Sequence, residues 1–279
     1  MYRSNNHQTG FSIVSLMIAS AIGIFIIGGA GKVYVDSKNT FSARTAVAAA
    51  TESYRFAFQD MRRYLVMAGR GVATSDDGAD SYSGTDNGLR TFPAIDGIPD
   101  GIASGDETVS SPWSPDPEDS SVVAVRYASG PAPCGLADNT LAAGTVTVRF
   151  LVDSDGDLIC QAYQGGVQII AQPMVSGVAQ MRALYGIDTD ADGVANQYLT
   201  ANQVGNTRWV NVVAIRIGIV VKSGDEAELP SVFRPEDPET LDLLGAEFTA
   251  PDSNHVYRSA TTTISLRNLH HINRQVSDI

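Results

Sequence analysis

The longest apolar stretch of the chain runs from Phe11 to Gly31 and contains no charged residue. At about 1.5 Å rise per residue, a helix of this length spans roughly 30 Å, enough to cross a bilayer core. A polar leader, residues 1–10, precedes the stretch, and no small-residue cleavage site follows it. A secretory signal has the opposite order, with its cleavage site after the apolar run. The pattern therefore predicts either an uncleaved membrane anchor or a leader removed in front of the apolar helix.

The pattern continues beyond this stretch with the period of an amphipathic helix. Apolar residues recur at spacings of three or four and form one face. They are Val47, Ala50, Tyr54, Phe58, Met61, Leu65 and Ala68. No proline occurs from Phe11 to Ala68, and Gly69 and Gly71 end the pattern. We therefore expect a single helix from Phe11 to Ala68, whose second half packs on a globular partner.

Strand-like alternation replaces the helical period after residue 120. Alternating or β-branched runs predict strands at 121–128, 145–151, 158–163, 167–171, 209–222 and 256–266, and residues 177–185 suit a strand or a helical turn. Residues 73–120 and 223–255 show no sustained period and predict long loops. This order of elements predicts an α+β fold, in which the long helix packs on an antiparallel sheet and no second domain is present.

Composition excludes one class of partner. The chain has 19 Lys and Arg against 31 Asp and Glu, a formal net charge of −12. Such a surface repels phosphate backbones, so we expect no direct nucleic-acid binding. Eleven of the acidic residues lie in the predicted loop 73–120, which holds one basic residue, Arg90. This loop is either a solvated acidic segment, a contact surface or a cation site.

The chain contains two cysteines, Cys134 and Cys160, both beyond the apolar stretch. In an oxidising compartment they would pair, whereas in a reducing one they would be buried free thiols. A disulfide closing a loop of this length would stabilise the fold by roughly 3–4 kcal/mol in the chain-entropy model.

Three carboxylates at alternate positions form the one candidate metal site. They are Asp188, Asp190 and Asp192, and Gly193 follows them. The spacing matches the first half of a calcium loop, because hard cations prefer clustered oxygen ligands. The Glu that ends such a loop is missing, since Leu199 stands there, although Asn196 or Gln197 could supply an oxygen. Alternating Asp with Gly is also a common turn, so both interpretations stay open. Residues 153–157 repeat the pattern more weakly and predict a hairpin turn.

Catalytic motifs are not evident in the sequence. The four histidines are His7, His255, His270 and His271, and no G-x-S-x-G occurs. Neither cysteine has a histidine near it in sequence. We therefore predict no catalytic residue and a protein that is not an enzyme.

Residues 10–19, GFSIVSLMIA, resemble the cleavage and methylation motif of type IV prepilins and type II secretion pseudopilins. The resemblance implies that a prepilin peptidase cuts after Gly10 and methylates the new N-terminal residue, Phe11. One position departs from the family pattern, because Ser15 stands where the family usually has Glu. The family's Glu is thought to pair with the N-terminal amine of a neighbouring subunit, so Ser15 bears on assembly.

The order of five further segments is similar to the PilW group of type IV minor pilins. These segments are MRRYLVMAGRG, VVAVRYAS with Cys134 after it, LYGIDTDADGVANQY, WVNVVAIRIGIVVKS and TTTISLRN. The resemblance implies a pilin-like fold and a structural role in starting or capping a pilus. Its partners would be other minor and major pilins, prepilin peptidase and the inner-membrane assembly machinery.

The resemblance also implies three parts of the chain. Residues 1–10 would be the leader, 11–35 the membrane and filament-core helix, and 36–279 the periplasmic head. The protein would span the inner membrane once before assembly and then join the filament at the cell surface. Two alternatives remain, a type II secretion pseudopilin and a membrane-anchored periplasmic enzyme or cation-binding protein.

Overall fold

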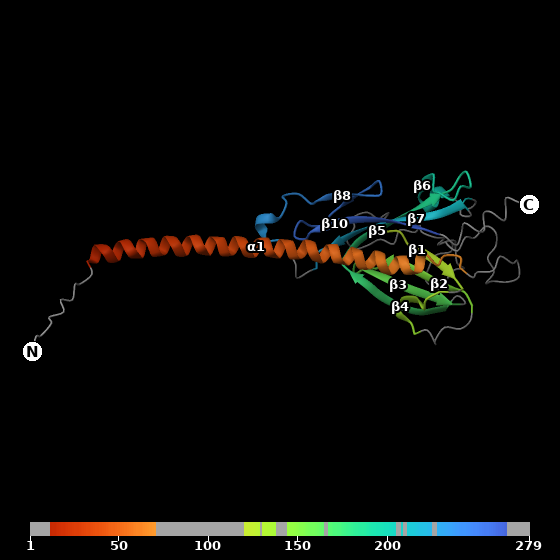
Figure 1. Cartoon of the computed structure of the whole chain (residues 1–279), viewed down its shortest axis with the longest axis horizontal. Coiled ribbons are helices and arrows are strands. Elements are labelled where there is room, and N and C mark those ends of the chain that lie inside the picture. The colour runs from red at the N-terminus through yellow and green to blue at the C-terminus, as the bar shows by residue number, and fades with distance from the viewer. Residues whose placement is uncertain are drawn as a thin grey trace, which may run out of the picture.

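A long helix that projects from a β-rich head dominates the structure (Figure 1). This helix, α1, covers Ile13–Leu65 in the computed structural model. The structure describes residues 12–70, 120–128, 130–137, 144–164, 167–204, 208, 211–224 and 228–266. Gly10, Phe11 and the predicted loop 73–120, except for Ser120, lie outside the described residues.

Helix α1 confirms the expected continuous helix and ends at Leu65 rather than Ala68. Residues 66–70 form a turn, in which the Met67 N–H donates to the Tyr64 carbonyl oxygen at 2.9 Å. Gly69 has φ of +72°, a left-handed conformation that glycine adopts without steric cost. The Gly69 N–H donates to the Arg126 carbonyl oxygen at 2.8 Å, which fixes the turn to the head.

The first sheet contains four antiparallel strands in the order β1-β2-β3-β4. Their bounds are β1 Val123–Tyr127, β2 Val146–Val152, β3 Asp157–Gln164 and β4 Val167–Ser176. Strand β4 extends well beyond the predicted 167–171. A short 3-10 helix, η1 (Pro133–Gly135), lies between β1 and β2 in sequence.

The second sheet is also antiparallel and has the order β10-β7-β5-β6. Its strands are β5 Val178–Ile187, β6 Gln197–Leu199, β7 Val212–Lys222 and β10 Tyr257–Ser265, and a short helix, α2 (Ala201–Val204), follows β6. The two sheets meet beside β1, where the Ser121 N–H donates to the Met181 carbonyl oxygen at 2.6 Å. The α+β class is therefore confirmed, with the expected sheet divided into two.

The core lies between the second half of α1 and the two sheets, which flank the helix in Figure 1. The helix contributes Ala46, Ala50, Ala57, Met61, Tyr64 and Leu65 as buried residues. Fully buried Phe150 and Met181 come from the two sheets and belong to the same cluster. One face of the helix is thus covered by alternate residues of both sheets.

A hairpin corrects the prediction of one unbroken loop at 223–255. Strands β8 (Thr240–Leu243) and β9 (Ala246–Thr249) pair within this range, and a 3-10 helix, η4 (Ser231–Phe233), precedes them. Leu244 and Gly245 have φ of +55° and +81°, as a tight two-residue hairpin turn requires. A second small core forms beneath the hairpin from Ala179, Val220, Leu243, Phe248, Ala250 and Tyr257. Charged residues between the apolar ones conceal these short strands in the sequence.

A disulfide joins Cys134 of η1 to Cys160 of β3, with the two Cα atoms 5.6 Å apart. The structure confirms the expected pairing, and no described cysteine is free. Both cysteines belong to the main core cluster. The crosslink therefore fastens the connection after β1 to the centre of the first sheet.

Replacing Gly218 with valine is expected to loosen the hairpin. A Cβ atom at Gly218 would lie 2.8 Å from Cδ1 of Leu243 and 3.1 Å from Cγ of Leu244. We expect Gly218→Val to lower the free energy of unfolding by about 1–3 kcal/mol through overpacking. Thermal unfolding of the detergent-solubilised chain measures this. Gly224→Val is the matched control, because no atom lies within 4 Å of its Cβ position. Equal melting temperatures for the two variants would contradict the prediction.

Candidate functional site: the projecting helix and the acidic loop

The first half of α1 presents apolar side chains to its surroundings on every side. From Ile13 to Ile27, the exposed fraction of the large apolar side chains ranges from 55% at Ile22 to 84% at Phe25. Among the described residues, α1 is the one helix long and apolar enough to cross a membrane. An apolar surface of this extent indicates a membrane or a protein interface, because a soluble surface does not sustain it.

Ser15 lies on this projecting half and is exposed. Ser15, Ala19 and Gly23 follow one another at four-residue spacing, so they form a narrow ridge of small residues on one helix face. Small residues let another helix approach closely in an apolar environment. No atom lies within 4 Å of the position that a Cβ would take at Gly23, so the ridge is open in the single chain.

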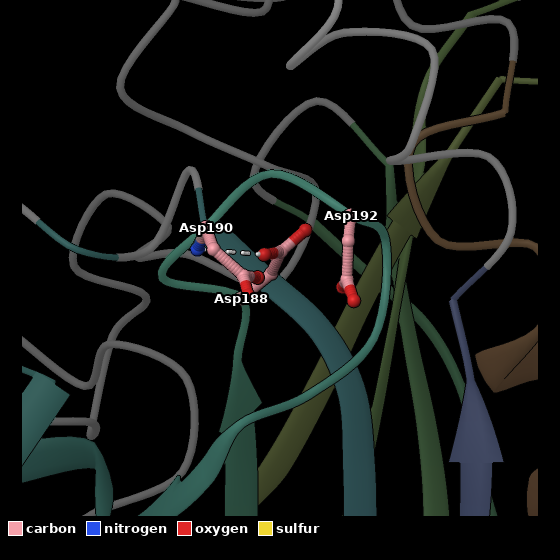
Figure 2. Close-up of side chains that lie close together, drawn as sticks. All are labelled: Asp188, Asp190 and Asp192. Carbon is pink, nitrogen blue, oxygen red and sulfur yellow. Dashed lines mark hydrogen bonds between the residues drawn. The ribbon is translucent and has the colours of Figure 1, made fainter.

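Residues 188–196, here called the acidic loop, connect β5 to β6. Figure 1 shows β6 at the end of the head farthest from the start of α1. Figure 2 shows Asp188, Asp190 and Asp192 grouped around this loop. One carboxylate oxygen from each lies within 4.8 Å of the other two. The structure therefore brings together the three predicted ligands, at a distance from Ser15.

Asp188 is the organising residue of the loop and is only 5% exposed. Its Oδ1 accepts hydrogen bonds from the N–H groups of Asp190 and Ala191 at 3.2 and 2.7 Å. Its Oδ2 accepts one from the Gly193 N–H at 2.7 Å. Burial alone would raise the pKa of Asp188, but these backbone donors outweigh it and hold the pKa below its usual value. The carboxylate therefore stays ionised at neutral pH.

Asn196 closes the loop rather than adding an oxygen to the cluster. Its Oδ1 accepts hydrogen bonds from the Thr189 N–H at 2.7 Å and the Thr189 hydroxyl at 3.0 Å. Its own N–H donates to the Ile187 carbonyl oxygen at 2.9 Å. Gln197, the other oxygen considered, is exposed at the start of β6. The loop thus has enough internal hydrogen bonds to be an ordered acidic turn, while three carboxylates remain close enough to share a cation.

Residues 153–157 form the predicted hairpin turn between β2 and β3. Oδ1 of Asp153 accepts hydrogen bonds from the Asp155 and Asp157 N–H groups at 3.0 and 2.8 Å. Gly156 has φ of +79°. In this turn, as in the acidic loop, an aspartate satisfies backbone donors that the strands do not reach.

A hydrogen-bonded cluster around a single aspartate, Asp252, was missed by the sequence interpretation. Oδ1 of Asp252 lies 2.9 Å from Nδ1 of His255, and its Oδ2 accepts the Tyr257 hydroxyl hydrogen at 2.9 Å. Burial alone would raise the pKa of Asp252, but the bonds from His255 and Tyr257 lower it. The Asp-x-Asn spacing is a turn signal that could have indicated this anchor. The cluster fixes the chain where it enters β10.

Comparisons with known proteins bear on residues 145–268. Over this range the chain matches the model of a family described as Type IV Pilus-assembly protein W. The match runs from the start of β2 to just beyond β10, and it confirms the resemblance to the PilW group over this part of the chain.

A type IV-like pilin from Thermus thermophilus is among the similar solved structures. It is 13% identical, the alignment covers 78% of this chain and 96% of that chain, and the TM-score is 0.42. A comparison with curated proteins gives no match.

Calcium binding by Asp188, Asp190 and Asp192 stays a prediction that calorimetry can test. We expect Ca²⁺ to release or absorb heat on titration and to raise the melting temperature. Saturation at about 100 times the dissociation constant would stabilise the fold by roughly 2.7 kcal/mol. An Asp190→Asn, Asp192→Asn double variant should lose both effects, because it removes the two exposed carboxylates and keeps the Asp188 turn. Asp155→Asn in the hairpin turn is the control. No calcium heat, together with no effect of EDTA on melting, would leave only the acidic turn.

Proposed function

We propose that this chain is a structural minor pilin of the PilW type that acts in type IV pilus assembly. The observation that carries the proposal is the family match over residues 145–268, attached in one chain to a projecting apolar helix. The prepilin-like junction Gly10–Phe11 stands directly in front of that helix. A cleavable leader, an apolar helix and a β-rich head are the parts that such a subunit needs.

The exposed half of α1 suits two successive environments. Before assembly, residues 11–35 would cross the inner membrane, with the head in the periplasm. In the filament, the same side chains would pack against the helices of other pilins, which again removes them from water. Burial of apolar surface contributes about 25 cal/mol per Å². Either environment therefore stabilises this half of the helix by removing its side chains from water. The head, residues 36–279, would remain at the filament surface.

Processing is the second part of the proposal. A prepilin peptidase would cut after Gly10 and methylate Phe11, which places the new N-terminus at the very start of the apolar helix. The partners are this peptidase, the inner-membrane assembly machinery, and major and minor pilins. The role is structural rather than catalytic.

Ser15 supports a position at or near the tip. In the family, the Glu usually found at this position is thought to pair with a neighbour's N-terminal amine in an apolar core, where an unpaired charge is costly. A serine hydroxyl carries no charge and cannot replace that ion pair. A subunit in an initiation or tip complex has fewer neighbours and can omit one such contact.

Deletion of the gene should abolish or sharply reduce piliation and leave protein secretion intact. Electron microscopy of surface filaments and a secretion assay measure the two outcomes. The reverse result would identify a type II secretion pseudopilin.

A chain with Gly10→Val should keep its leader, as mass spectrometry of the purified protein would record, and should fail to restore pili. Restoration by the uncleaved chain would contradict a pilin role and favour a membrane-anchored periplasmic protein.

Ser15→Glu should change the position of the subunit in the filament. The new carboxylate could pair with a neighbour's amine, so we expect the variant to appear along the filament as well as near the tip. Immunogold labelling of sheared pili measures the distribution. Ser15→Ala is the matched control, because it removes the hydroxyl without adding a charge. An unchanged distribution for Ser15→Glu would reduce Ser15 to a tolerated variation.

A further inference from the structure

The short helix η4 presents two neighbouring apolar side chains at the surface of the head. Val232 is 75% exposed and Phe233 is 47% exposed. We call this pair the apolar tip. The Phe233 N–H donates to the Pro230 carbonyl oxygen at 2.8 Å, which closes the turn that carries the tip. Single exposed apolar side chains are ordinary on a protein surface, whereas two in succession on a loop form a small patch suited to a partner.

Hydrogen bonds on both sides of the apolar tip hold its loop in place. Nε of Arg234 donates to the Leu229 carbonyl oxygen at 2.8 Å, and its Nη2 lies 2.8 Å from Oε2 of Glu228. The Leu229 N–H in turn donates to the Asn254 carbonyl oxygen at 2.6 Å, which ties the loop to the turn before β10. The tip is therefore presented by an ordered loop, and its one basic neighbour is already paired with an acidic one.

The apolar tip lies at the end of the head that faces the projecting half of α1. Figure 1 shows η4 as a short blue coil next to the α1 label, and among the described elements of the head it lies nearest to the start of α1. The long axis of the molecule is horizontal in this view and α1 runs along it, so the view gives the order of elements along the helix. The acidic loop lies toward the opposite end of the head.

The helix indicates where a membrane surface would lie relative to this end of the head. The uncharged run ends at Gly31, residues 24–38 are all exposed, and half-buried positions resume at Asn39. Eight residues of helix separate Gly31 from Asn39, a rise of about 12 Å. The headgroup layer outside the hydrocarbon core is about 5–8 Å thick on each side. The near edge of the head therefore lies within a few ångströms of the headgroups.

Aromatic side chains on α1 support the same membrane level. Tyr34 is 71% exposed and Phe41 is 72% exposed, and both follow the uncharged run. Aromatic residues are enriched where a helix leaves the hydrocarbon core, because their rings suit the headgroup region. A tilt of about 20°, which is usual for a single span, would bring one side of the head still closer to the lipid.

We propose that the apolar tip inserts into the headgroup region of the bilayer that α1 spans, so that the head contacts the membrane before assembly. The proposal rests on the proposed membrane span of residues 11–35 and deepens it. Lipid is favoured over a second protein as the occupant, because the tip lies near the level where α1 leaves the core and continues the exposed apolar surface of the helix. Such a contact would fix the rotation of the head about the helix axis, which a single span leaves free.

Fluorescence quenching by brominated lipid tests this contact. The full chain is reconstituted into nanodiscs of phosphatidylcholine that carries bromine on the acyl chains close to the headgroup. Tryptophan is introduced by Phe233→Trp, and the emission of the wild type, which contains Trp113 and Trp209, is subtracted. We expect the added emission to be quenched as strongly as that of a Tyr34→Trp variant, which reports the span itself.

Val194→Trp is the matched control for this experiment. Val194 is 62% exposed on the acidic loop, toward the other end of the head, and its variant should keep its added emission in brominated nanodiscs. Equal emission loss in Phe233→Trp and Val194→Trp, with Tyr34→Trp quenched, would overturn the tip contact and leave the span in place. An unquenched Tyr34→Trp would overturn the span. Blue-shifted emission of Phe233→Trp without bromine quenching would also overturn the lipid contact and assign the tip to a protein partner.

Discussion

The two halves of one helix need different surroundings, and this constraint determines the rest of the structure. The first half of α1 is apolar on all sides and receives no cover from the head, whereas the second half buries a single face. A helix end without protein around it holds together because its backbone hydrogen bonds are internal. The head packs only on the second half, where both sheets contact the helix.

The helix residues that pack on the head differ in size along the helix. The first buried positions are alanines, Ala46, Ala50 and Ala57, and the last are larger, Met61, Tyr64 and Leu65. Small side chains let strands pass close to the helix axis, while large ones contribute most of the buried apolar area. Tyr64 packs near Phe150, with ring centres 6.0 Å apart, on the sheet that the disulfide also crosslinks. The attachment is therefore strongest where the chain leaves the helix.

Most of the fold could be predicted because its signals are long or periodic. The helix, its apolar half and the long strands β1, β2, β7 and β10 follow from residue pattern and spacing. The pattern left β5 open between a strand and a helical turn, and it left the cysteines open between a disulfide and two free thiols. The division into two sheets could not be predicted, because it depends on which strands pair over long distances. The β8–β9 hairpin was missed since each strand has only four residues and Asp242 and Glu247 interrupt the apolar pattern.

The acidic residues show why the sites are harder to predict than the fold. Asp153 and Asp188 stand in Asp-rich stretches and Asp252 does not, yet each of the three accepts backbone N–H groups in a turn. A carboxylate that already accepts several such bonds is stable without a cation, so spacing alone overstates the case for metal ligands. In the turns of this head, the role of each of these aspartates is therefore set by the backbone N–H groups within its reach.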